Sequence, residues 1–250
     1  MVYFTGHSII NYITQQSGDV EFMVETYSFL FWSHDREVSD EYIAQTTCNI
    51  AELLKLYVGE PVINYETGYS KSSVRHIAIS KDFMLQKLRQ MRKHSRTLNG
   101  FIFSFFSSLD DAKMIGIRFA FGDFRGLMPN SVIVHFPPAF FTIQKDHSKT
   151  WRLFQELTYE IHPYYAVFAN NQNKELSKKY WEQKPTLIHT YNFFDNDTIR
   201  LIGKKKLLME PGLEATDSGA FLKLLPEHLR LENKEHLQKQ KEVSQRLALL

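Results

Sequence analysis

Residues 100–122 read GFIFSFFSSLDDAKMIGIRFAFG, and their pattern is the clearest structural signal in the chain. Two apolar runs flank a short polar segment at Leu109–Asp111. In the second run Ile115, Ile117 and Phe119 alternate with small or polar residues. Alternation with a period of two, on either side of turn-forming residues, is typical of an antiparallel hairpin. We therefore expect an antiparallel sheet at the centre of the chain.

Other segments with strand-like composition lie on both sides of this hairpin. We expect strands at residues 20–32, 132–136, 165–169 and 221–225. A second hairpin is predicted from residues 187–194 and 198–202 around Asp195–Asp197, because Asp and Asn favour turns. Residues 204–219, which contain Pro211, Gly212 and Gly219, are expected to form a loop.

Helix signals recur between the strands. Ser39, Ser80, Ser148 and Asn233 are predicted N-caps of helices, and a short helix is expected at residues 176–181. Apolar residues with helical spacing follow Ser39 as far as Tyr57, and Gly59 ends that helix. The sequence thus predicts an α+β protein, in which a largely antiparallel sheet packs with several helices. We expect a single domain over residues 1–250, with its core from about residue 20 to residue 250.

The composition of the chain argues against several classes of protein. The net charge of +2 argues against a strongly basic nucleic-acid binder, and we expect no direct contact with nucleic acid or a membrane. The single cysteine, Cys48, excludes a disulfide within the chain and is best explained as a small apolar residue. Residues 1–14 lack the pattern of a signal peptide, and no run approaches the ~18 apolar residues of a membrane helix. A cytoplasmic location is expected.

The sequence carries no recognisable catalytic motif. It has no HExxH, no Gly-x-Ser-x-Gly, no Walker A and no zinc-type cysteine spacing, so no enzyme activity, metal or cofactor is predicted. Asp110–Asp111 is explained by a turn, and Glu182–Lys184 has nuclease-like spacing without a convincing acidic partner. A binding protein is the favoured interpretation. A motif-poor hydrolase and a general adaptor or scaffold are the alternatives.

An acidic segment provides the candidate binding residues. Glu210, Glu214 and Asp217 follow the basic run Lys204–Lys206, and they are expected to lie near Asp195 and Asp197. Carboxylates on one surface would complement a basic partner. We predict that these five residues contact a partner protein.

Several strings occur in an order that resembles the immunity protein 52 family of bacterial polymorphic toxin systems. They are Tyr27–Trp32 followed by Arg36, Gly100–Ser104, Val132–Pro137, Thr190–Tyr191, Asp217–Gly219 and Asn233–His236. Two positions depart from the family pattern: Ser33 replaces a glycine, and Ile188–His189 lacks an expected tryptophan.

This resemblance implies an α+β protein that binds and neutralises a cognate toxin by direct protein–protein contact. Members of the family are associated with nuclease toxins of the restriction-endonuclease fold. Such a toxin acts in the cytoplasm, which agrees with the expected location. The resemblance assigns no catalytic residue and no cofactor to this chain.

Overall fold

The predicted central hairpin is present as strands β4 (Phe101–Phe106) and β5 (Gly116–Phe121), paired antiparallel. The structure is a computed structural model. It describes residues 26–34, 38–59, 62–66, 74–94, 100–110, 113–124, 129–137, 140–141, 146–173, 185, 187–247 and 249. The predicted strand residues 20–25, the family residue Arg36, the helix at 176–181 and the segment Glu182–Lys184 lie outside the described residues.

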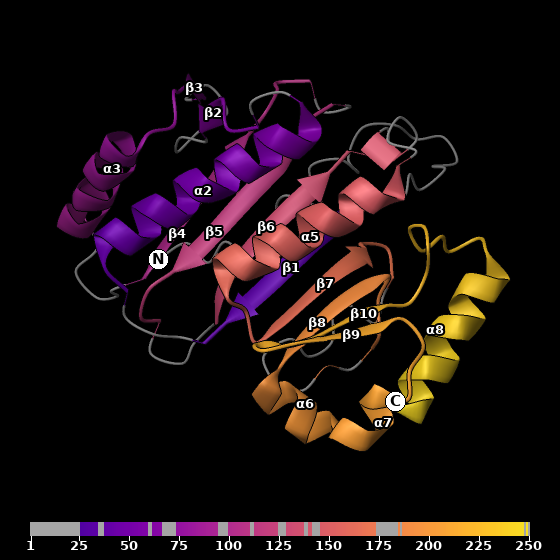
Figure 1. The fold of residues 1–250 in the computed structure, drawn as a ribbon. Coiled ribbons are helices and arrows are strands. Elements are labelled where there is room, and N and C mark those ends of the chain that lie inside the picture. The colour runs from indigo at the N-terminus through magenta and orange to yellow at the C-terminus, as the bar shows by residue number, and fades with distance from the viewer. Residues whose placement is uncertain are drawn as a thin grey trace.

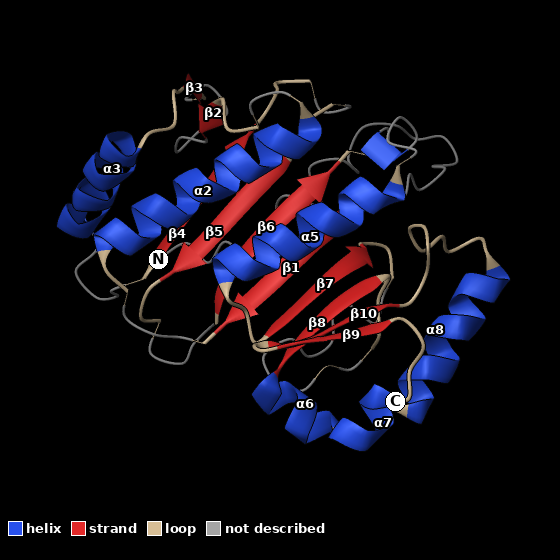
Figure 2. Cartoon of the chain, in the orientation of Figure 1, coloured by secondary structure: helices blue, strands red, loops and turns tan. Residues whose placement is uncertain are grey.

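The hairpin belongs to one ten-stranded sheet (Figures 1 and 2). The other strands are β1 (Tyr27–Ser33), β2 (Tyr65–Glu66), β3 (Arg75–His76), β6 (Asn130–Phe136), β7 (Tyr165–Asn170), β8 (Tyr191–Asp195), β9 (Leu213–Thr216) and β10 (Gly219–Lys223). Their order is β3-β2-β4-β5-β6-β1-β7-β8-β10-β9, and each adjacent pair of strands runs antiparallel. The α+β class with an antiparallel sheet is confirmed.

Three longer helices cover one face of the sheet. They are α2 (Asp40–Val58), α3 (Lys81–His94) and α5 (His147–Ile161), as Figure 1 shows. Ser39 caps α2 by accepting from the Tyr42 amide at 3.1 Å, and Gly59 ends the helix in the left-handed region at φ 88°. Ser80 caps α3 in the same way, through the Phe83 amide. The N-cap of α5, however, is Asp146, which accepts from the amide of the predicted cap Ser148.

Three more helices, α6 (Asn196–Ile202), α7 (Lys204–Leu208) and α8 (Lys234–Arg246), pack on the opposite face beneath the C-terminal strands. Asn233 caps α8, as predicted. The protein therefore has two hydrophobic cores, one on each face of the sheet, and successive side chains of β7 point alternately into them. Phe168 packs with the α2–α5 side, whereas Tyr165 and Val167 pack with the α6–α8 side. In the first core Cys48 is partly buried, and burial raises the pKa of its thiol.

The C-terminal third corrects three predictions. Residues 198–202 are not the second arm of a hairpin, because β8 leads directly into α6. Residues 204–219 are not one loop, because they contain α7 and β9. The last strand is β10, two residues earlier than predicted, and it pairs with both β8 and β9. Among the strands that the structure describes, β9 is consequently at one end of the sheet.

A buried carboxylate fixes the other end of the sheet. Glu66 on β2 is 1% exposed and accepts from Lys87 Nζ of α3 at 2.6 Å. It also pairs with Arg75 of β3. Because Lys87 is itself mostly buried, this ion pair is poorly screened by water, and loss of the Glu66 charge would leave a cation without its partner.

We predict that Glu66→Gln lowers the free energy of unfolding by about 2 kcal/mol, since Lys87 keeps its charge but loses its carboxylate. Urea unfolding followed by circular dichroism would measure the change. The matched control is Glu52→Gln, whose exposed side chain pairs with Lys55 at 4.0 Å. The control should cost less than about 0.5 kcal/mol. Equal losses in the two variants would contradict the prediction.

Candidate functional site

Three of the five predicted binding residues gather where α6 begins. Asp195 is the N-cap of α6 and accepts from the Thr198 amide at 2.7 Å. Asp197 lies in the first turn and pairs with Arg200. Asp217 is exposed in the turn between β9 and β10, and its carbonyl accepts from Asn196 Nδ2 at 2.9 Å. The turn that carries Asp217 thus lies beside the start of α6.

The other two predicted residues lie elsewhere. Glu214 on β9 is exposed and accepts from Gln155 Nε2 of α5 at 3.0 Å, so it faces the first layer of helices. Glu210 is 7% exposed and holds Arg246 of α8 through two bonds of 2.9 and 2.7 Å. Its carboxylate ties the end of α7 to α8. The five residues therefore do not form one continuous acidic surface.

An apolar surface that was not predicted from the sequence lies on α6 and α7. Leu201, Leu208 and Met209 are 58%, 54% and 84% exposed, and we call these three residues the α6–α7 apolar patch. Only seven large apolar residues are exposed within the described ranges, and three of them fall within nine consecutive residues on two helices that contact each other. The exposed lysines Lys204–Lys206 lie between its members in the sequence. The signal in the sequence is the run KKKLLM, in which Leu207 alone is buried.

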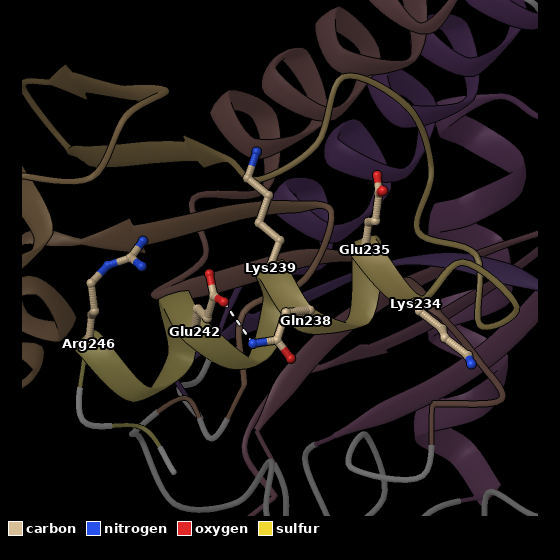
Figure 3. A pocket seen from close by; sticks show the side chains of 6 residues that line it. All are labelled: Lys234, Glu235, Gln238, Lys239, Glu242 and Arg246. Carbon is tan, nitrogen blue, oxygen red and sulfur yellow. Dashed lines mark hydrogen bonds between the residues drawn. The ribbon is translucent and has the colours of Figure 1, made fainter.

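The hollow on α8 is a different kind of surface. It is shallow and lined by Lys234, Glu235, Gln238, Lys239, Glu242 and Arg246, all from one helix (Figure 3). Gln238 Nε2 donates to Glu242 Oε1 at 2.7 Å, and Arg246 is already bound to Glu210. Charges of both signs alternate along it. This arrangement is that of a solvated helix face and offers no enclosed space for a small substrate.

One serine–histidine pair bears on the hydrolase alternative. Ser28 Oγ of β1 lies 2.7 Å from His135 Nδ1 of β6, and the two residues are cross-strand partners. Ser28 is fully buried, so its hydroxyl cannot meet a substrate. In serine hydrolases the nucleophilic hydroxyl is usually hydrogen-bonded to Nε2 of the histidine, and a carboxylate orients the ring through Nδ1. Here the serine lies against Nδ1. We interpret the pair as a structural link between two central strands.

The same histidine is electrostatically disfavoured as a cation. Burial, and then the positive charge of Arg118 on β5, together lower the pKa of His135 to about 4. Among the described residues no group of three His, Cys, Asp or Glu side chains is arranged to hold a metal ion. In the same residues, no helix combines the length and apolar character needed to cross a membrane.

Comparisons with known proteins define the fold class. No family model matches the chain, and no curated protein matches it. Among solved structures, the fold is similar to that of the Pseudomonas aeruginosa T6SS protein PA0821, with a TM-score of 0.57 and 9% sequence identity. The likeness covers 96% of this chain and 82% of that chain. At this identity it shows a shared fold, and membership of the immunity protein 52 family stays a prediction.

The lowered pKa of His135 predicts a pH dependence of stability. Its pKa of about 4 in the folded state lies below the ordinary value of 6.5, so protons bind the unfolded chain more readily. The free energy of unfolding should therefore be highest above about pH 7 and fall as the pH drops from about 6.5 towards 4, by up to about 1.4 kcal/mol per pH unit.

Urea titrations at pH 7.5 and 5.0 would measure this loss. His135→Gln, which keeps a neutral polar side chain, should show a smaller difference between the two pH values than the wild type. Some dependence should remain, because burial also lowers the pKa of His189, to about 3. An identical difference in wild type and His135→Gln would refute the assignment.

Proposed function

We propose that this chain is an immunity protein that binds a cognate bacterial toxin and neutralises it by direct contact. The observation that carries the proposal is the shared fold with a T6SS protein over 96% of the chain. T6SS proteins belong to interbacterial competition, the setting in which immunity proteins act. The ordered sequence strings from Tyr27 to His236 support the same function from independent evidence.

The described surface suits binding better than catalysis. The one serine–histidine pair is buried at Ser28, and the hollow on α8 is open and carries charges of both signs. Exposed apolar residues on α6 and α7 provide material for a protein interface, in which a few large side chains contribute most of the affinity. We propose no catalytic residue and no cofactor.

We further propose that the toxin is a nuclease of the restriction-endonuclease fold. A nuclease needs a positive cleft to hold its phosphate substrate. Carboxylates of the inhibitor can approach such a cleft and raise the rate of association. Asp197, Glu214 and Asp217 are exposed and can meet a partner, although Asp197 pairs with Arg200 and Glu214 accepts from Gln155. Asp195 instead caps a helix, and Glu210 is buried against Arg246. A cytoplasmic site of action follows from this proposal.

The direct test is co-expression with the product of the adjacent open reading frame. We expect this chain to rescue cells from killing by that product and to co-purify with it. A harmless neighbour, or a toxic neighbour that neither binds nor is neutralised, would overturn the proposed function. An adaptor or scaffold would instead bind several partners and give no rescue.

The triple variant Asp197→Asn, Glu214→Gln, Asp217→Asn tests the acidic residues. It should slow association with the toxin by about tenfold at low ionic strength and weaken the salt dependence of the rate, because steering by charge is reduced. Stopped-flow mixing would measure both effects. Three exposed carboxylates on α2 and α3 supply the matched control Glu41→Gln, Glu52→Gln, Asp82→Asn. Equal rates in both triple variants would reject the acidic surface.

A further inference from the structure

The α6–α7 apolar patch is exposed although its neighbours are firmly packed. Ile199, Ile202 and Leu207 enter the second core and are at most 9% exposed. Leu201 of α6, Leu208 of α7 and Met209, the C-cap of α7, are each more than half exposed. Folding therefore does not require their apolar character. Single exposed leucines are common in proteins, but three within nine residues point to a contact surface.

The backbone beneath the patch is held in place. The amides of Lys206 and Leu207 donate to the Gly203 carbonyl at 3.0 and 3.3 Å, and Gly203 turns the chain at φ 103°. The Met209 amide donates to the Lys206 carbonyl. The next residue, Glu210, is bound through its carboxylate to Arg246 of α8. A surface fixed before binding loses little conformational entropy when a partner arrives. A surface held in this way is typical of a preformed protein interface.

The charge around the patch defines the chemistry of its partner. Lys204, Lys205 and Lys206 are exposed, and none pairs with a carboxylate in the described part of the chain. Three adjacent ammonium groups repel one another and attract carboxylates on an approaching surface. They would be repelled by the positive substrate cleft of a nuclease. The patch and the acidic residues around Asp197 and Asp217 thus suit surfaces of opposite charge.

We infer that the α6–α7 apolar patch with Lys204–Lys206 binds the toxin outside its substrate cleft, on an apolar hollow bordered by carboxylates. This inference rests on the proposed function. Leu208 and Met209 supply the anchoring side chains, and the lysines pair with the acidic border. The toxin is then held at two places, by its cleft through Asp197, Glu214 and Asp217 and by its acidic surface through α6 and α7.

Two variants test the inference with the purified, catalytically inactivated product of the adjacent toxin gene. Leu208→Ser, Met209→Ser should raise Kd at least tenfold, because the central apolar contacts are lost. Lys204→Glu, Lys205→Glu, Lys206→Glu should also raise Kd tenfold or more at low salt, and the ratio of its Kd to that of the wild type should shrink when NaCl is added, because salt screens the new repulsion. Titration calorimetry at 50 and 300 mM NaCl would measure both.

The matched controls use exposed residues that lie far in the sequence from the patch at residues 201–209. Leu56 and Leu109 are 75% and 63% exposed, so Leu56→Ser, Leu109→Ser controls for the loss of apolar surface. Lys55→Glu, Lys93→Glu, Lys113→Glu controls for the charge change. Both should change Kd less than twofold. If the wild type binds and rescues but the patch variants match their controls, the inference fails while the proposed function stands. If the wild type does not bind, both fail.

Discussion

The fold depends on strands that must bury both of their faces. In β7, β8 and β10, successive side chains point to opposite sides of the sheet, and both sides are covered by helices. Phe193 and Phe194 illustrate this constraint, since the first enters the α2–α5 core and the second the α6–α8 core. A register shift of one residue would move every aromatic ring in a strand to the wrong layer. Helices α6 and α7 are held at their places by this fixed register.

The elements predicted correctly from the sequence are those whose signals lie within a few neighbouring residues. The hairpin of β4 and β5 alternates because one of its faces is less buried, and Ile102 on that face is 43% exposed. Ser39, Ser80 and Asn233 were correctly identified as caps because a polar side chain there satisfies free amides at the start of a helix. These features need no knowledge of distant residues.

The predictions were wrong for segments whose structure is decided by contacts with residues far away in the sequence. Asp195 suits both a turn and a helix N-cap, and the short run after it contains Thr198, Ile199 and Ile202, which also suit a strand. Burial of those three residues at helical spacing decided the outcome. Glu210 reads as a loop carboxylate until Arg246, 36 residues later, is seen to bind it. The position of the acidic residues was therefore predicted in part, while the run KKKLLM indicates the α6–α7 apolar patch only once the exposure of Leu208 and Met209 is known.

The end strand β9 has a consequence for how the protein behaves at high concentration. It offers only four residues, and the opposite end strand, β3, offers two. Glu214 and Arg75 place charges on these edges. Another copy of the chain would find only a short template on either described edge for extending the sheet by hydrogen bonding, and charged side chains on an edge must lose water before a new strand can pair there. The described edges of this broad, aromatic-rich sheet are therefore poor templates for edge-to-edge association.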